Sequence, residues 1–226
     1  MDEIAHNLAQ VRAKIAAACQ RAGRSTDEVT LVAVSKLQPS ALIEAAYAQG
    51  QHDFGENYPQ ELRDKATELA HLPKLRWHAI GTLQTNKVKY VAKAATSFHA
   101  LCSLEIAQEL HRRCEGRPID VFVEVNIAGE DQKSGIAPRD ASALAERLRS
   151  LPGLRLVGLM CMPPQPPARW TPEDNRRHFA ALRELGKSLG LPQLSMGSTS
   201  DYEVAIEEGA TVVRVGRSIF GSRPTH

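Results

Sequence analysis

Short apolar segments alternate with longer helical patterns along the chain, and this alternation limits the possible folds more than any other feature. Each apolar segment is short and is bounded by Gly, Pro or polar residues, which is typical of a buried strand. Strands that alternate with helices favour a parallel sheet. We predict eight strands, with the sequences TLVAVS, HDF, LRWHAIG, SFHAL, DVFVEVN, LRLVGLM, LSM and TVVRVG.

Eight strand–helix repeats within 226 residues predict an α/β protein with a closed (β/α)8 TIM barrel. An open doubly wound sheet is the alternative fold. The charged amphipathic stretch MDEIAHNLAQVRAKIAAACQRAG predicts an extra N-terminal helix, and MPPQPPARWTPED fits a long loop after the sixth strand. No segment is typical of a linker, so we expect residues 1–226 to form a single domain. The other predicted helices are Ser40–Gln49, Pro59–Ala70, Thr85–Ala94, Leu104–Glu115, Pro138–Ser150, Pro172–Leu189 and Tyr202–Glu208.

The composition excludes several broad classes of function. The formal net charge is +2 and the basic residues do not form one run, so we expect no nucleic-acid partner. No apolar run is long enough to span a bilayer and no signal peptide is recognisable, so we expect no membrane association and a cytoplasmic location. Cys19, Cys102, Cys114 and Cys161 lack paired metal-ligand spacing, so we predict no metal site.

Polar residues and glycines follow the predicted strands, and the C-terminal ends of the strands carry the chemistry in barrels of this kind. One amine, that of Lys36, directly follows the first strand. The complete set is Ser35–Lys36, Gly55–Asn57, Gly81–Thr82, Cys102–Ser103, Asn126, Cys161–Met162, Gly197–Ser200 and Gly216–Ser218.

The ends of the seventh and eighth strands suit a phosphate group. Three hydroxyl residues, 198–200, precede a helical pattern that Asp201 can cap. They form either a Ser/Thr-rich N-cap without a ligand or a cradle for a phosphate dianion at the positive end of a helix. In VVRVGRSIFGSR, Gly216 allows close approach of the backbone and Ser218 begins another short helix. Two such loops on adjacent strands favour the phosphate interpretation.

Two cationic side chains have more than one interpretation. Arg214 lies inside a strand, where a guanidinium needs a partner; it forms a structural ion pair or points into the barrel mouth toward a ligand. Lys36 faces water, or it is buried enough for its amine to form a Schiff base with a carbonyl. A phosphorylated aldehyde would satisfy both the amine and the phosphate site. The residues alone leave open pyridoxal 5′-phosphate (PLP) and the sugar phosphate of a Schiff-base aldolase.

Five segments carry a resemblance to a known family and cover nearly the whole chain: AVSK, FGEN, WHAIGTLQTNK, VFVEVNIAGEDQKSG and LSMG…SDYEVAIEEGATVVRVGRSIFG. On these motifs the chain resembles the pyridoxal phosphate homeostasis proteins. The resemblance implies a fold-type III PLP-binding barrel, similar to the barrel domain of bacterial alanine racemase. It also implies PLP as the cofactor and a role in intracellular PLP (vitamin B6) homeostasis with no or negligible catalysis.

The resemblance also implies roles around the cofactor ring. It places the Schiff base on Lys36, Asn57 near the ring hydroxyl and Arg214 opposite the pyridine nitrogen. An arginine cannot accept the proton of that nitrogen, so carbanion chemistry at a bound amino acid is weakened. This favours a PLP carrier. The alternative, a PLP-dependent amino-acid racemase, needs a second base on the opposite face of the ring.

At the phosphate, the resemblance implies backbone N–H groups from Gly216 and Arg217 and hydroxyl groups from the loop that holds Thr199 and Ser200. Two positions depart from the family pattern. Ser198 and Thr199 replace a methionine and a serine, and the threonine keeps a hydroxyl. Arg217 replaces a serine or threonine, so it adds charge at the phosphate or turns outward.

Three further residues have a functional and a structural interpretation. Lys87 and Lys133 are ordinary surface lysines or transient second acceptors during PLP transfer. His78 packs near the cofactor ring or is a hydrogen-bonded core histidine. A delivery role would make PLP-dependent apoenzymes the recipients, and a lone barrel is expected to be a monomer.

Overall fold

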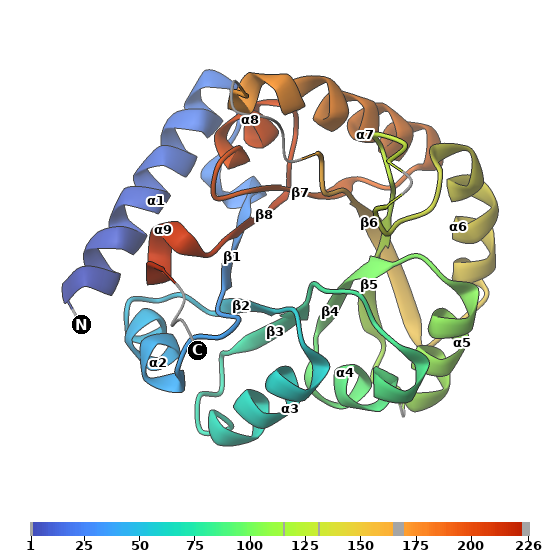
Figure 1. Ribbon diagram of the computed structural model, residues 1–226, viewed down its shortest axis with the longest axis horizontal. Helices are drawn as coiled ribbons and strands as arrows, with labels where there is room; N and C mark the ends of the chain where they lie inside the picture. The colour runs from blue at the N-terminus through green and yellow to red at the C-terminus, as the bar shows by residue number, and fades with distance from the viewer. Residues whose placement is uncertain (1, 115, 131, 165–169, 223–226) are drawn as a thin grey trace.

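Eight parallel strands close into a barrel in which sequence neighbours are also spatial neighbours (Figure 1). The computed structural model describes residues 2–114, 116–130, 132–164 and 170–222. The closed ring confirms the predicted (β/α)8 barrel, and the open doubly wound alternative is wrong. The strands are β1 Thr30–Val34, β2 Asp53–Glu56, β3 Arg76–Ala79, β4 Ser97–Leu101, β5 Ile119–Glu124, β6 Leu154–Met160, β7 Gln193–Ser198 and β8 Val212–Val215.

Helices connect the strands and surround the barrel (Figure 1). The predicted helices are confirmed to within about two residues at each end, and three of them begin with a 3-10 turn. Part of the predicted long loop after β6, residues 165–169, lies outside the described residues, as does Glu115. The helices are α1 Asp2–Arg21, α2 Ser40–Ala48, α3 Pro59–Glu68, α4 Val88–Ala94, α5 Leu104–Arg113, α6 Ala141–Arg149, α7 Arg176–Leu189, α8 Tyr202–Glu207 and α9 Arg217–Phe220, with 3-10 turns η1 Thr26–Glu28, η2 Thr85–Lys87, η3 Pro138–Asp140 and η4 Pro172–Asn175.

The N-terminal helix α1 covers the outside of the barrel where β8 pairs with β1 (Figure 1). Its apolar residues recur at helical spacing and are buried: Ile4, Leu8, Val11 and Ile15. The helix packs against α2, α8 and α9. α1 thus supports the two strands that, on the sequence prediction, carry Lys36 and Arg214 to the site.

Two strands are longer than the sequence predicts. The segment HDF ends at Phe54, but β2 continues through Gly55 and Glu56, and β7 similarly extends beyond LSM. Glycine and glutamate have low strand propensity. Here the backbone pairing of Gly55 with β3 outweighs that propensity. The extension matters because it places Glu56 at the level of the site.

A buried lysine joins the carboxyl ends of β1 and β2. Lys65 in α3 is only 7% exposed, and its ammonium donates to the Ser35 carbonyl at 2.7 Å, Glu56 Oε1 at 2.8 Å and Glu61 Oε1 at 2.7 Å. All three ammonium hydrogens therefore have acceptors. The Ser35 hydroxyl also donates to Glu56 Oε1, at 2.6 Å. The residue before Lys36 is thus held by both its carbonyl and its side chain.

The residue after Lys36 is held by the same cluster. The Leu37 backbone N–H donates to Glu61 Oε1 at 2.7 Å. Leu37 has a φ of 60°, the left-handed region that costs a leucine energy unless neighbouring contacts stabilise it. The cluster of Lys65, Glu56 and Glu61 therefore holds the backbone on both sides of Lys36.

Sequence reasoning assigned no role to Lys65, although a signal was present. Lys65 lies three residues after Leu62 and four before Leu69, on the face of α3 that both leucines bury. A lysine on an apolar helix face needs a buried partner. That partner, Glu56, has its pKa raised to about 7 by burial, although Lys65 and Ser35 both act to lower it.

We predict that Lys65→Met lowers the free energy of unfolding by about 3–5 kcal/mol at pH 8, because Glu56 stays buried without its cation. Urea unfolding followed by circular dichroism measures the change. Lys74→Met, at an exposed lysine before β3, is the matched control and should change stability by less than about 0.5 kcal/mol. A Lys65→Met protein as stable as the wild type would contradict the anchoring role.

Candidate functional site

The carboxyl ends of β1 and β2 place Lys36 beside Asn57. Val34 pairs with Gly55, and the Ser35 N–H donates to the Gly55 carbonyl at 3.0 Å. Lys36 and Asn57 follow at matching levels, and both are half-buried. The structure therefore brings together the first two residues that the sequence assigned to the site.

The ends of β7 and β8 bring the predicted phosphate residues together. Thr199 Oγ1 accepts a hydrogen bond of 3.3 Å from the Gly216 N–H. Gly216 itself lies against β1, since a Cβ there would come within 3.1 Å of the Val34 carbonyl oxygen. At the start of α9, no described residue accepts from the N–H groups of Arg217 and Ser218, as expected at a helix N-terminus.

The role expected of Asp201 needs correction. Its side chain does not cap α8. Instead Asp201 Oδ1 accepts from the Ser198 N–H at 2.7 Å and from the Ser198 hydroxyl at 3.1 Å, and Oδ2 accepts from Asn175 at 2.7 Å. The tight turn at Gly197, with a φ of 89°, directs the chain back toward these partners. The Ser198 hydroxyl is therefore engaged within the loop, and Thr199 and Ser200 are the hydroxyl residues that remain for a phosphate.

A cavity of about 240 Å³ opens at this end of the barrel. Among the predicted site residues, Ser200, Arg214 and Arg217 line it, whereas Lys36, Asn57, Thr199 and Gly216 do not. Arg217 is exposed, and it reaches the same cavity as the buried Arg214. The lining residues are Met162, Pro163, Pro164, Trp170, Asn175, Gly197, Ser198, Ser200, Asp201, Arg214 and Arg217.

Arg214 is a buried guanidinium whose hydrogen-bond partners are all neutral. It donates to Ser195 Oγ at 2.6 Å, to the Cys161 carbonyl at 3.1 Å and to Met162 Sδ at 3.0 Å. Three of its five N–H groups are used, so two remain for a ligand. Burial lowers the pKa of Arg214, although an arginine stays charged at neutral pH. Of the two interpretations from the sequence, the geometry supports the one in which Arg214 faces a ligand.

A chain of hydrogen bonds continues from Arg214 through the barrel interior. Ser195 Oγ lies 2.7 Å from His99 Nδ1, and His99 Nε2 lies 3.0 Å from His78 Nδ1. His78 Nε2 lies 2.9 Å from Asp53 Oδ1, at the first residue of β2. The chain thus spans the barrel from its carboxyl-terminal mouth to its amino-terminal mouth.

With both imidazoles neutral, one set of tautomers satisfies every link. A carboxylate only accepts, so His78 Nε2 carries the proton and His78 Nδ1 accepts from His99 Nε2. His99 Nδ1 then accepts from the Ser195 hydroxyl, and the Ser195 oxygen accepts from Arg214. In every link the donor lies on the Arg214 side and the acceptor on the Asp53 side, so Arg214 is the first donor of the chain.

The pKa shifts of His99 and Asp53 agree with this direction of donation. Burial lowers the pKa of His99 well below its usual value, and the nearby His78 and Arg214 lower it further. Burial alone would raise the pKa of Asp53, but hydrogen bonds from His78 and Arg76 outweigh it and hold the pKa at about 2. The chain therefore joins the Arg214 cation to the Asp53 anion through a neutral His99. The interpretation of His78 as a hydrogen-bonded core histidine is confirmed.

Glu124 is a second acidic residue that sequence reasoning missed. It ends β5 and is 5% exposed; Oε1 accepts from the Ser134 hydroxyl at 2.8 Å, and Oε2 has no partner among the described residues. Burial raises its pKa, although the charge of Arg214 opposes the shift. An acid inside the apolar run VFVEVN was the available signal.

The two lysines considered as second PLP acceptors lie in loops. Lys133 donates to the Pro163 carbonyl at 2.9 Å and pairs with Glu130 at 2.7 Å, so it is tied to the loop after β6. Lys87 lies in η2, 5.9 Å from the centre of the Tyr90 ring. A second-acceptor role for either lysine stays a prediction.

The remaining features concern disulfides, metal binding and membrane-spanning helices. The four cysteines are free thiols. No described group of three or more His, Cys, Asp or Glu side chains is placed to hold a metal ion. Within the same part of the chain, no helix has the length and apolar character needed to cross a membrane.

The arrangement defines a class: an α/β barrel with a lysine, a buried arginine and a hydroxyl- and amide-rich loop around one mouth.

Residues 1–224 match the family described as "Alanine racemase, N-terminal domain". A protein named pyridoxal phosphate homeostasis protein from Pseudomonas aeruginosa is 48% identical over 229 residues, covering 99% of this chain and 97% of that protein. The Escherichia coli K12 protein of the same name is 43% identical over 236 residues, covering 99% and 98%.

Solved protein structures also resemble this chain. PipY of Synechococcus elongatus with PLP bound has a TM-score of 0.82 and 34% identity, covering 96% of this chain and 100% of that one. Alanine racemase from Corynebacterium glutamicum has a TM-score of 0.68 at 17% identity, covering 99% and 61%, which shows a shared fold. The chain belongs to the alanine racemase N-terminal domain family and, within it, to the pyridoxal phosphate homeostasis proteins. The resemblance found in the sequence is confirmed.

The neutral state of His99 predicts a pH dependence. Unfolded histidine binds a proton near pH 6.5, whereas folded His99 binds one only at much lower pH. Below pH 6.5 the unfolded state therefore holds more protons, and stability falls as the pH falls, by up to about 1.4 kcal/mol per pH unit for one such group.

We predict that His99→Gln reduces this dependence between pH 6.5 and 5, because glutamine keeps one donor and one acceptor but does not titrate. Urea unfolding at several pH values compares the two proteins. The groups that face His99, namely His78 and Arg214, are present in both, as are the buried Glu56 and Glu124. Parallel stability curves for the two proteins would contradict a neutral His99.

Proposed function

We propose that this protein binds PLP as a Schiff base on Lys36 and takes part in intracellular PLP homeostasis without catalysing a reaction. The observation that carries this proposal is the buried Arg214, which has neutral partners, spare N–H groups and a cavity beside it. A guanidinium in this state suits a neutral acceptor such as an unprotonated pyridine nitrogen. PLP-bound PipY, a relative at 34% identity, supports the choice of ligand.

The residues around the barrel mouth fit each part of PLP. The aldehyde would meet Lys36, the ring hydroxyl Asn57 and the ring nitrogen Arg214. The phosphate would lie at the start of α9, where the N–H groups of Arg217 and Ser218 have no acceptor among the described residues. Further contacts to the phosphate would come from Thr199, Ser200 and Gly216.

The Lys65 cluster supports Lys36 as the attachment point. Ser35 and Leu37 are both hydrogen-bonded to it, so the backbone of Lys36 cannot move freely. A backbone that is already held in place adds little to the entropic cost of binding a ligand at Lys36.

The same geometry supports a weak catalyst. Bound PLP acts in enzymes as an electron sink, and a protonated ring nitrogen strengthens that sink. Arg214 donates and cannot return a proton, and its chain of hydrogen bonds ends at the distant Asp53. The protein would therefore hold PLP reversibly and favour neither racemisation nor other carbanion chemistry. A PLP-dependent racemase remains the alternative.

The physiological setting belongs to the same proposal. A monomeric barrel that holds PLP by a reversible bond would deliver it to PLP-dependent apoenzymes. Lys133 is the better placed of the two candidate second acceptors, because its contact with Pro163 ties it to the loop that borders the cavity.

We predict that Lys36→Ala abolishes the visible absorption band of the PLP-treated protein and its trapping by borohydride, because the variant lacks the amine assigned to the Schiff base. Absorption spectra and peptide mass mapping measure both effects. Lys87→Ala and Lys133→Ala are matched controls that should keep the band and the pyridoxyl mass on the Lys36 peptide. A Lys36→Ala protein that folds normally and keeps the band would contradict the assignment.

We predict that Arg217→Ala weakens PLP binding about tenfold, the loss expected of one charge-assisted hydrogen bond. Binding of pyridoxal, which lacks the phosphate, should stay unchanged. Spectroscopic titrations with both compounds separate the two effects, and Arg139→Ala, at an exposed arginine of η3, is the control. An equal change for both compounds, or no change for either, would mean that Arg217 turns away from the phosphate.

A further inference from the structure

We propose that the amino-terminal mouth of the barrel is a second ligand site that binds a small oxyanion, a phosphate or carboxylate group of a metabolite. A cavity of about 650 Å³ lies there. The first residues of several strands line it, among them Thr30 of β1, Asp53 of β2, Ser97 of β4 and Gln193 of β7. Because the strands are parallel, this cavity lies at the opposite end of the barrel from Lys36.

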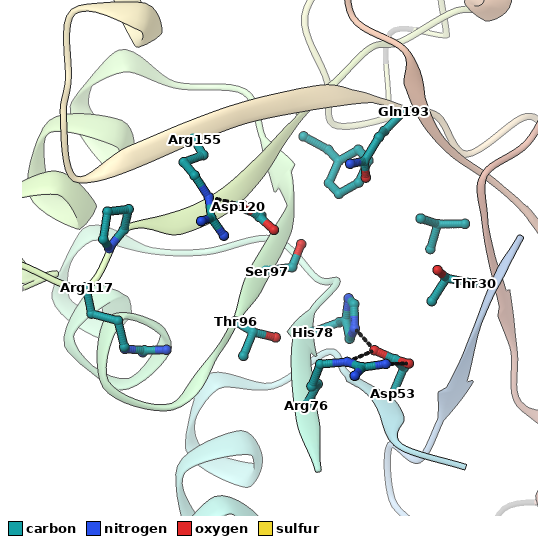
Figure 2. Close-up of a pocket in the computed structure, with 13 residues that line it drawn as sticks. Thr30, Asp53, Arg76, His78, Thr96, Ser97, Arg117, Asp120, Arg155 and Gln193 are labelled. Carbon is teal, nitrogen blue, oxygen red and sulfur yellow. Dashed lines mark hydrogen bonds and ion pairs between the residues drawn. The ribbon is translucent and has the colours of Figure 1, made fainter. Parts of the chain in front are cut away.

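Two arginines at the rim have N–H groups to spare. Arg155 of β6 donates through Nε to Asp120 Oδ1 at 2.6 Å, and no described residue bonds its two Nη groups. Arg117, just before β5, uses only Nη2, which donates to backbone carbonyls at the end of α4. Figure 2 shows both guanidinium groups on one side of the cavity, with Arg76 and Asp53 on the other.

The floor of the cavity holds a buried hydroxyl without a partner. Ser97 is 5% exposed, and no described residue bonds its Oγ. Its neighbour in the sheet, His78, is fully engaged with Asp53 and His99 and offers it nothing. Buried polar groups in folded proteins nearly always have a partner, so an orphan on a cavity wall points to a ligand or an ordered water. The arginines beside it favour a charged ligand.

The charges and the hydrogen-bond capacity select an anion. Three arginines and two aspartates line the cavity, which gives it a formal charge of +1 when histidine is counted as neutral. Both Asp53 oxygens accept from Arg76, and Asp120 accepts from Arg155, so the carboxylates are already neutralised. The unused donors are the Nη groups of Arg155, the Nε and Nη1 of Arg117 and the Ser97 hydroxyl, and they outnumber the one unused carboxylate oxygen, Asp120 Oδ2. A phosphate or carboxylate supplies the matching acceptors.

The amino-terminal site differs chemically from the PLP site proposed above. No lysine lines this cavity, so an aldehyde has no amine to attach to, and the ligand would bind without a covalent bond. The inference is also independent of the PLP proposal, because it uses none of the residues assigned to the cofactor.

The test is a titration of the full-length protein with sodium phosphate at constant ionic strength, followed by the arginine Nε–Hε signals in 1H–15N NMR spectra. We expect saturable shifts of the Arg155 and Arg117 signals, with the exposed Arg139 as the internal control. The shifts should persist in Arg217→Ala, which separates this site from the phosphate cradle of the other mouth. Shifts confined to Arg214 or Arg217, or equal shifts of all exposed arginines, would overturn the proposal.

Two variants and a second anion test the proposed site further. Ser97→Ala should weaken phosphate binding about tenfold while leaving the protein at least as stable, because it removes an unpaired buried hydroxyl. Arg155→Met should abolish the Arg117 shift. Succinate in place of phosphate distinguishes the sources: saturation by succinate alone identifies a carboxylate ligand, and saturation by phosphate alone identifies a phosphate ligand. Failure of both probes would exclude the site.

Discussion

The candidate site depends on one buried ammonium group. Lys65 reaches from α3 to the ends of β1 and β2, and its three acceptors are the Ser35 carbonyl, Glu56 and Glu61. Removing this cation would leave two carboxylates next to each other with little solvent. The complete cluster thus reinforces the backbone around Lys36, which the hydrogen bond from the Ser35 N–H to the Gly55 carbonyl also holds.

The second constraint is the one-way chain of hydrogen bonds behind Arg214. Its direction follows from the two ends, since the guanidinium only donates and the Asp53 carboxylate only accepts. Ser195, His99 and His78 join them through the core, and each of these three side chains is hydrogen-bonded on both sides. The arginine keeps its positive charge, and none of its hydrogen bonds among the described residues goes to a carboxylate. These properties distinguish a site that holds a pyridine ring from one that activates it.

Much of the fold could be predicted from the sequence because it depends on local patterns. The runs SFHAL and LRLVGLM match β4 and β6 to the residue; β4 is buried along its whole length, and β6 is buried over its last three residues. The predicted strands at β2 and β7 were too short, because Gly55 and Gly197 have low strand propensity and pairing with neighbours decides. The prediction at β3 was too long, because the strand ends at Ala79 and not at Gly81. The strand order then brought Lys36, Asn57 and Arg214 to one mouth, because the ends of parallel strands meet there.

The supporting residues could not be predicted in the same way. His99 and Ser195 are 96 residues apart and become partners only when the barrel closes. Lys65, Glu124 and Ser97 each carried a weak signal, a polar residue in an apolar position, but that signal does not name the partner. The unused hydroxyl of Ser97 in particular is visible only once the cavity at the amino-terminal mouth is known.

The most direct test is a crystal structure of the protein grown with PLP. It should show continuous density from Lys36 Nζ to the cofactor, with the pyridine nitrogen within hydrogen-bond distance of Arg214 and the phosphate at the start of α9. PLP attached to another lysine, or a ring nitrogen that faces a carboxylate, would contradict the assignment of the site.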